Sequence, residues 1–210
     1  SFCQACSDAF NPITSHICPV CSTPLDKSQE NHWCGDCLQK RPYYDAAHAY
    51  YLYEGAVMDV IHQFKYGSKS YLSKSLGPLL ARFAEKIFQP SENLLTIPVP
   101  LHPKRLRERG FNQSLLLAKY VASQLGATLD FLSLRRIRYT SPQTGLGKEE
   151  RRKNVRNAFK LMHENIVKGK TVLLVDDVVT TGNTLNECAR ILKRSGSRNV
   201  FCLVLARAGY

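Results

Sequence analysis

Two adjacent acids and a cluster of hydroxyl side chains form the stretch of this 210-residue chain with the clearest chemistry. Asp176 and Asp177 follow the apolar run 172–175, and a helical pattern begins near residue 184. The first turn of a helix offers backbone N–H groups and a positive dipole end to an anion, and glycine lets the backbone approach closely. We therefore predict a phosphate site in the turn after the acids, made by Val178, Val179, Thr180, Thr181, Gly182, Asn183 and Thr184.

The acids indicate what accompanies the phosphate. Two carboxylates would repel a phosphate unless they bind something else, and a ribose diol or hydroxyl-bound Mg²⁺ suits their oxygens. An Asp-Asp turn before a Thr-capped helix in an ordinary α/β protein is the alternative. The stretch resembles the motif that binds 5-phosphoribosyl 1-diphosphate (PRPP) in type I phosphoribosyltransferases. The resemblance implies that Asp176 and Asp177 bind the ribose hydroxyls and serve catalysis, and that residues 180–184 hold the 5-phosphate.

Two apolar segments must position these groups. The run 172–175 has the length and β-branched content of a buried parallel strand, and residues 94–100 predict a second strand cut short by prolines. A loop that follows a parallel strand lies at the ligand-binding edge of the sheet. Its members are candidates for binding a diphosphate: Val99, Pro100, Leu101, Lys104, Arg105 and Arg109. Lys65, at the end of a helix expected over 55–64, and Gln143 are further candidates.

The charge of the chain is unevenly distributed. The net charge is +12, yet residues 1–45 hold three basic and five acidic side chains. A basic surface suits nucleic acid or a diphosphate substrate, and a merely solvated basic face is the alternative. We expect DNA contacts from Arg107, Arg135, Arg136, Arg138, Arg151, Arg152, Lys153 and Arg156. Candidate aromatic stacking partners are Tyr43, Tyr44, Tyr50, Tyr51, Tyr53 and Phe111, most of which suit the core equally well.

Six of the eight cysteines form three Cys-x-x-Cys pairs, namely Cys3/Cys6, Cys18/Cys21 and Cys34/Cys37. This spacing predicts zinc rather than disulfides, and a closed four-cysteine site is structural rather than catalytic. The second and third pairs, separated by twelve residues, can close one site, and the first and second pairs are the competing choice. A redox role is the weaker alternative. Cys188 and Cys202 lie in helix and strand patterns and are expected in the core.

Length and composition favour one α/β domain with a small appendage, and we place a zinc-ribbon module at 1–42 and the sheet domain at 43–210. No run approaches a membrane span and no signal-peptide pattern opens the chain, so we expect a cytoplasmic protein without membrane insertion. Further predictions are a helix over 72–88, a strand over 129–134, a basic loop over 101–112 and a long irregular segment over 138–156 that resembles a lid.

Nearly the whole chain resembles the ComF family of competence-associated, phosphoribosyltransferase-like proteins. Besides the acidic motif and the cysteine pairs, the resemblance rests on F-K-Y-G (64–67), I-P-V-P-L-H (97–102), R-E-R-G-F-N-Q-S (107–114), T-S-P-Q-T (140–144) and R-K-N-V-R-N-A-F (152–159). It implies a doubly wound parallel sheet of about five strands. Family members often carry four cysteine pairs. The three pairs here resemble the last three, which favours Cys18, Cys21, Cys34 and Cys37 as the zinc site and sets Cys3 and Cys6 apart.

The same resemblance implies a function. The family takes up or handles transforming DNA, so the implied ligands are PRPP with Mg²⁺, structural Zn²⁺ and single-stranded DNA. A DNA helicase or other competence proteins are the implied protein partners. A phosphoribosyltransferase with an unidentified acceptor, a non-catalytic DNA-handling scaffold and a PRPP-sensing regulator all remain compatible with the sequence.

Overall fold

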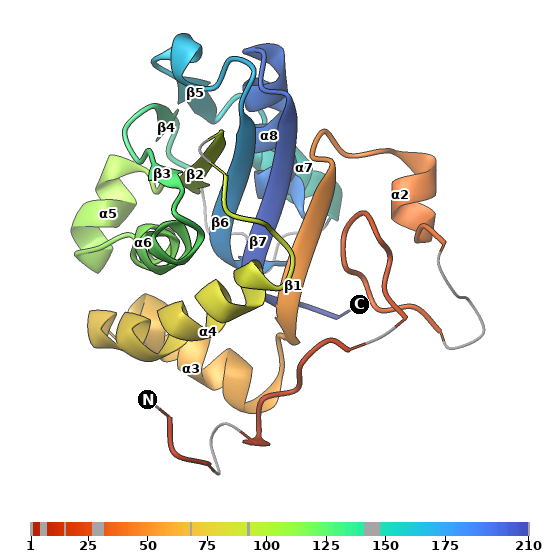
Figure 1. Cartoon of the computed structure of the whole chain (residues 1–210), viewed down its shortest axis with the longest axis vertical. Helices are drawn as coiled ribbons and strands as arrows, with labels where there is room; N and C mark the ends of the chain where they lie inside the picture. Colours follow the sequence, from red (N-terminus) through yellow and green to blue (C-terminus); the bar gives the residue numbers. More distant parts are fainter. Residues whose placement is uncertain are drawn as a thin grey trace.

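Five parallel strands form the central sheet of the computed structural model, which describes residues 2–4, 8–14, 16–26, 32–67, 69–91, 93–140 and 148–209. In order across the sheet they are β1 (Ala46–Leu52), β7 (Asn199–Arg207), β6 (Thr171–Val179), β2 (Leu94–Pro98) and β3 (Thr128–Leu129). Every neighbouring pair is parallel (Figure 1). The doubly wound parallel sheet expected from the sequence is confirmed.

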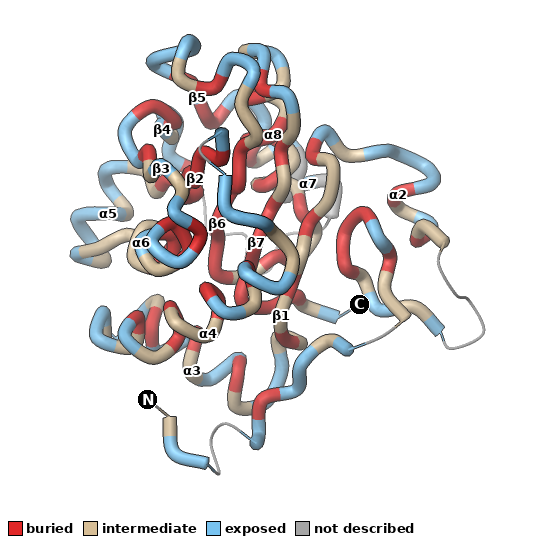
Figure 2. Tube along the Cα trace, in the orientation of Figure 1, coloured by how far each residue is buried: buried red, intermediate tan, exposed pale blue. Residues whose placement is uncertain are grey.

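The central strands are buried on both faces, which explains their continuous apolar runs. All five residues of β2 are buried, and Figure 2 shows that β6 and β7 are also largely buried. Strand β6 is longer than its apolar run, because it continues through Asp176 and Asp177 to Val179. Both acids are thus held in a regular strand rather than in a loop.

Helices cover both faces of the sheet, as a doubly wound fold requires. On one face, α3 (Gly55–Tyr66), α4 (Ser73–Glu85) and α6 (Gln113–Leu125) bury their apolar sides in one cluster with β6. On the other face lies α8 (Asn183–Arg194), with α7 (Lys148–Val155) beside it. The helix predicted over 72–88 therefore ends three residues earlier than expected.

Several short elements complete the chain: α2 (Gly35–Gln39), α5 (Pro103–Arg109), two 3₁₀ turns (Ser70–Leu72 and Glu164–Ile166), and a hairpin of β4 (Leu134–Arg136) and β5 (Phe159–Leu161). The basic loop expected after residue 100 is wrong in part, since α5 begins there with a proline in its first turn. The segment expected to be irregular contains α7, and residues 141–147 lie outside the described part.

The strand predicted over 129–134 is also wrong. The Asp130 carboxylate accepts hydrogen bonds from the backbone N–H groups of Leu132 (3.0 Å) and Ser133 (3.2 Å), which turns the chain between β3 and β4. The apolar residues of 129–134 favour a strand, but the hydrogen bonds of the Asp130 side chain form a turn there instead.

The cysteine module, by which we mean the described residues between 8 and 41, packs against the edge of β1. Backbone hydrogen bonds join Ile13 N to Tyr50 O and Ala47 N to Val20 O, each 2.8 Å long. The Arg207 guanidinium of β7 donates to the Cys21 carbonyl at 2.7 Å. The module therefore covers an edge strand and shares the core of the sheet domain. Within the described residues, no helix combines the length and apolar character needed to cross a membrane.

Candidate functional site

The order of the strands creates a crevice at the carboxyl ends of β2 and β6. These strands are neighbours, but the chain proceeds from β2 to β3 at one edge and from β6 to β7 on the opposite side. The connections that follow the two strands therefore diverge, and ligands bind at such a point in open α/β sheets. Asp176 and Asp177 lie at the end of β6, and residues 99–101 follow β2.

The two acids are buried and each has a defined partner. Asp176 Oδ1 accepts a hydrogen bond from Ser114 Oγ of α6 at 2.7 Å and from the backbone N–H of Asp177 at 2.9 Å. Asp177 Oδ2 lies 3.0 Å from Lys65 Nζ of α3. Both partners come from helices that cover the same face of the sheet, α3 and α6, so the end of β6 is held from two helices.

Burial strongly affects the protonation of these groups. Loss of solvation, aided by the charge of Asp177, raises the pKa of Asp176 to about 7. Burial by itself would lower the pKa of Lys65, but the nearby carboxylates of Asp177 and Asp176 outweigh it, so that pKa is raised. Lys65 thus stays charged, whereas the Asp176 carboxyl gains or loses its proton close to neutral pH.

The turn after β6 brings backbone and hydroxyl donors to the start of α8. Gly182 has a φ of +72°, and a Cβ there would lie 3.3 Å from the Tyr44 hydroxyl oxygen, so the conformation and the close packing both favour glycine. The Thr181 Oγ1 atom is buried without a hydrogen-bond partner among the described residues. A buried hydroxyl without a partner beside a helix N-terminus is suited to an oxygen-rich anion.

A cleft of about 480 Å³, the sheet-edge cleft, brings together residues that are widely separated in the sequence. Among the residues singled out from the sequence, it is lined by Lys65, Val99, Pro100, Leu101, Arg105, Arg109, Arg136, Asp176, Asp177, Val178, Thr180 and Thr184. Its charges are mixed, with four cations facing two acids. The structure thus assembles the predicted acids, the loop after β2 and part of the turn around one space.

Other candidates lie elsewhere. Val179 is buried in the core, and the Lys104 ammonium lies 4.7 Å above the centre of the Tyr139 ring. Asn183 lies in a second cleft beside Asn186 and Arg190. Gln143 falls outside the described residues.

Besides Tyr53, a stacking candidate, the sheet-edge cleft contains residues that the sequence did not single out as ligands: His62, Tyr66, Gln113, Ser114 and Thr140. The side chain of Asn112 caps α6 and donates to the Val99 carbonyl at 3.1 Å, which fixes Ser114 next to the loop after β2. Arg109 donates to Gln113 Oε1 at 2.5 Å and lies over the Tyr66 ring. In the sequence, the only indication of Ser114 is its position just after the N-cap residue Asn112. Only the three-dimensional structure shows that it contacts Asp176.

The predicted DNA contacts are distributed over the two clefts and exposed positions. Arg136 lines the sheet-edge cleft and bonds to Thr140, whereas Arg107 and Arg135 are exposed on other elements. Arg138 Nη2 donates to the backbone carbonyls of Asn154 (2.9 Å) and Arg156 (2.7 Å), so it braces the end of α7. Lys153 and Arg156 line the second cleft. The side chains of Arg151 and Arg152 lie outside the described part.

Most aromatic candidates are structural. Tyr44 and Tyr51 are buried, and Tyr50 stacks on Phe83 with ring centres 4.5 Å apart. Phe111 contacts the buried Phe64 ring, and Tyr53 lines the sheet-edge cleft. Tyr43 is different, since 46% of it is exposed.

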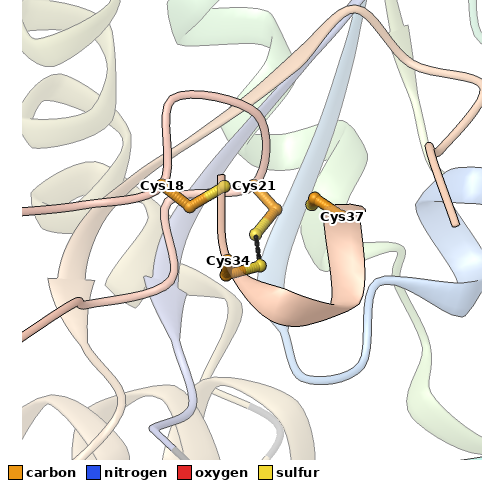
Figure 3. Close-up of side chains that lie close together, drawn as sticks. All are labelled: Cys18, Cys21, Cys34 and Cys37. Atoms are coloured by element: carbon orange, nitrogen blue, oxygen red, sulfur yellow. Dashed lines mark hydrogen bonds between the residues drawn. The ribbon is translucent and has the colours of Figure 1, made fainter. Parts of the chain in front are cut away.

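Four buried cysteines of the cysteine module have the arrangement of a zinc site. The sulfurs of Cys18, Cys21, Cys34 and Cys37 all lie within 4.8 Å of one another, and Figure 3 shows them converging from a loop and from the start of α2. Tetrahedral Zn–S bonds of about 2.3 Å require sulfurs about 3.8 Å apart, so the set fits with little adjustment. Burial raises the pKa of the Cys37 thiol, and a central Zn²⁺ would stabilise the thiolates instead. Cys3 is exposed, and Cys6 lies outside the described part.

The remaining two cysteines are core residues, as expected. Cys188 of α8 and Cys202 of β7 are fully buried, and burial raises the pKa of both thiols. Such thiols are inert at neutral pH.

Two known family models match separate parts of the chain. A phosphoribosyl transferase domain model matches residues 112–209, and a double zinc ribbon domain model matches residues 1–38. The first match includes both acids and the turn of the sheet-edge cleft. The second includes all four clustered cysteines.

Three characterised proteins match over most of the chain. "DNA utilization protein YhgH" of Salmonella typhimurium is 35% identical over 210 residues, which cover 98% of this chain and 89% of that protein. "Competence protein F" of Haemophilus influenzae is 34% identical, with 97% and 90% covered, and "Competence protein ComFC" of Bacillus subtilis is 27% identical, with 92% and 78% covered. Among solved structures, a glutamine PRPP amidotransferase from Bacillus subtilis is 22% identical over 63% of this chain and 25% of that chain, at a TM-score of 0.41.

Proposed function

This chain belongs to the ComF family of competence-associated, phosphoribosyltransferase-like proteins, and from that membership we propose that it binds PRPP with Mg²⁺ in the sheet-edge cleft and acts in DNA uptake. The relatives named for competence and for DNA utilization support the cellular role. In that role the protein would handle incoming single-stranded DNA on its basic surface.

The observation that carries PRPP binding is the position of two buried acids next to an anion-binding turn. Asp176 and Asp177 lie in the cleft that also contains Thr180 and Thr184, at the start of α8. Carboxylates accept hydrogen bonds from a ribose diol, while hydroxyls and the helix N-terminus suit a phosphate. Lys65 neutralises one of the acids and thereby reduces the repulsion that a phosphorylated ligand would meet.

The diphosphate would lie opposite the acids, against the loop after β2. Arg105 and Arg109 line this side of the cleft, and guanidinium groups bind phosphate oxygens in bidentate fashion. When bound, Mg²⁺ would be held by the diphosphate and ribose oxygens and would neutralise their charge. In a transfer reaction a nucleophilic nitrogen of the acceptor would bond to the anomeric carbon as the bond from that carbon to the diphosphate breaks, and the two arginines would stabilise the charge on the departing diphosphate.

Calorimetric titration of Mg–PRPP tests the proposal. The wild-type chain should bind, and the double variant Asp176→Ala/Asp177→Ala should bind at least about 100-fold more weakly, because each carboxylate supplies charge-assisted hydrogen bonds of about 1.5–3 kcal/mol. A matched control is Asp59→Ala/Glu85→Ala, which removes two exposed acids from α3 and α4 without touching the cleft.

The control should bind like the wild type. Absence of binding to folded wild type would refute the PRPP site and leave a DNA-handling scaffold. Release of diphosphate with candidate acceptors then separates a transferase from a PRPP-sensing protein.

A further inference from the structure

A second cleft, of about 440 Å³, lies where the cysteine module meets α7 and α8. We call it the basic cleft because five of its lining residues are cations: Lys40, Lys153, Arg156, Arg190 and Arg194. Three asparagines and Tyr43 also line it. It shares the start of α8 with the sheet-edge cleft, but Thr184 lines one cleft and Asn183 the other.

The acid of the basic cleft does not cancel its charge. Glu187, the carboxylate among its lining residues in the described part, accepts two hydrogen bonds from Arg190, from Nε at 2.9 Å and Nη2 at 2.6 Å, and one from Asn157 N at 2.8 Å. Although partial burial opposes it, the hydrogen bonds from Arg190 and Asn157 lower the pKa of Glu187. One ion pair thus leaves four further cations, and Lys40, Lys153, Arg156 and Arg194 are all exposed.

The walls of the basic cleft are fixed to one another. The backbone N–H of Tyr43, just beyond the cysteine module, donates to Asn186 Oδ1 of α8 at 2.6 Å. Arg190 Nη2 also donates to Asn157 Oδ1 at 3.3 Å, which holds the segment after α7 against α8. The cations thus come from three parts of the chain that are joined by hydrogen bonds. The backbone segments that carry them are therefore held in place relative to one another, while four of the five cationic side chains are exposed.

We propose that the basic cleft binds the phosphate backbone of single-stranded DNA and that the exposed Tyr43 ring stacks on a base. This inference rests on the proposed role in DNA handling and gives it a location. The four cations that remain beside the ion pair exceed what one phosphate group, with a charge of about −2, would require. Single-strand sites combine a basic groove with an exposed aromatic ring, and both features occur here. An acidic protein would use the cations but not the ring.

Fluorescence anisotropy with a labelled oligothymidine, recorded at several salt concentrations, tests this site on the full zinc-loaded chain. The variant Arg156→Gln/Arg194→Gln removes two cations of the basic cleft. The control Lys74→Gln/Lys119→Gln removes two exposed cations from α4 and α6, on the other face of the sheet. Only the first variant should lose affinity, by about tenfold, with a salt slope smaller by about 2. Tyr43→Ala should weaken binding at unchanged slope. Circular dichroism and zinc content confirm that each variant is folded.

The outcomes separate the two proposals. If the wild type does not bind the oligonucleotide, DNA binding fails as a whole. If it binds and both double variants lose affinity equally, DNA binding stands and the basic cleft is refuted as its site. Competition by inorganic phosphate at equal molar concentration would identify a small-anion site and also refute the proposal. Unchanged affinity in the first variant would assign the basic cleft to another partner, such as an acidic protein.

Discussion

The two clefts on either side of the start of α8 hold their charges in different ways. In the sheet-edge cleft the acids are almost completely buried, and each is fixed by a partner at 2.7 to 3.0 Å. In the basic cleft the cations are mostly exposed, and the one ion pair given above lies against its wall. Buried, prearranged charges are costly and suit one ligand of fixed shape. Exposed cations suit a polyanion of variable conformation.

The difference also follows from which part of the chain supports each cleft. The sheet-edge cleft is built on the central strands β2 and β6 and on helices α3 and α6. The basic cleft takes Lys40 and Tyr43 from the connection between the cysteine module and β1. The stability of the cysteine module should therefore matter to one cleft and much less to the other.

Loss of zinc should have the largest effect, and it should weaken ligand binding in the basic cleft more than in the sheet-edge cleft. Structural zinc contributes about 10 kcal/mol in small zinc domains, comparable with the whole stability of a domain. Cys34→Ser should abolish stoichiometric zinc binding, lower the melting temperature and weaken oligonucleotide binding more than Mg–PRPP binding. Metal analysis, calorimetry and anisotropy measure the three effects.

Cys188→Ala is the matched control for the zinc variant, because Cys188 is also a buried cysteine but lies outside the cysteine cluster. It should keep its zinc and both affinities. Equal loss of both ligands in Cys34→Ser, at a temperature where the protein is still folded, would contradict the separation of the clefts.

Removing Lys65 should reveal the cost of the buried acids. In Lys65→Met the Asp177 carboxylate, whose side chain is 3% exposed, loses its ion-pair partner, and stability should fall by about 3 kcal/mol. The double variant Lys65→Met/Asp177→Asn removes both charges and should recover most of this loss. Urea denaturation measures both values. Lys193→Met, which breaks the more exposed pair with Asp45, should cost only about 0.5 kcal/mol. A similar loss in both single variants would mean that burial of Asp177 adds nothing.

Much of the fold could be predicted because its signals are local. Buried parallel strands have continuous apolar runs, and the spacing of apolar residues in 55–64 and 113–125 is that of amphipathic helices. The predictions of secondary structure were wrong where a single side chain redirects the backbone. Asp130 turns the chain after β3, and Pro103 with the capping His102 starts α5 in an expected loop. Such effects depend on hydrogen bonds that no periodicity reveals.

The candidate sites could be predicted only in part. The motif around Asp176 contains its chemistry in consecutive residues, and the four clustered cysteines have the spacing of zinc ligands. The partners of the acids come from helices distant in the sequence, so Ser114 could not be predicted from its neighbours, and Lys65 is predicted from the sequence as a phosphate ligand rather than as the partner of Asp177. The basic cleft was missed for the same reason, since Lys40 and Arg194 are 154 positions apart in the chain.

The smallest effect, a pH dependence, should occur in one cleft alone. The pKa of Asp176 is about 7, and its ionised form is the better acceptor for ribose hydroxyls. Mg–PRPP affinity should therefore rise by up to about tenfold between about pH 6 and about pH 8. The described residues that line the basic cleft include no histidine, the side chain whose ordinary pKa lies in this range, so oligonucleotide affinity should stay constant. Calorimetry measures the Mg–PRPP affinity and fluorescence anisotropy the oligonucleotide affinity across this pH range.

Two variants assign the titrating group. His62 also lines the sheet-edge cleft, and His62→Gln should keep the pH dependence. Asp176→Asn should bind PRPP weakly and lose the pH dependence of binding, apart from the titration of the ligand's own phosphate near pH 6.

The pH dependence of protein stability tests the protonation of Asp176 independently of PRPP binding. The folded pKa lies above the ordinary value of 3.8, so the stabilising contribution of Asp176 is complete below about pH 4 and is lost as the pH rises through about 7. Asp176→Asn should thus gain stability relative to the wild type as the pH rises from about 6 to about 8. A constant difference would mean that the protonation of Asp176 does not change between about pH 6 and about pH 8, and would contradict a pKa of about 7 for this buried carboxyl.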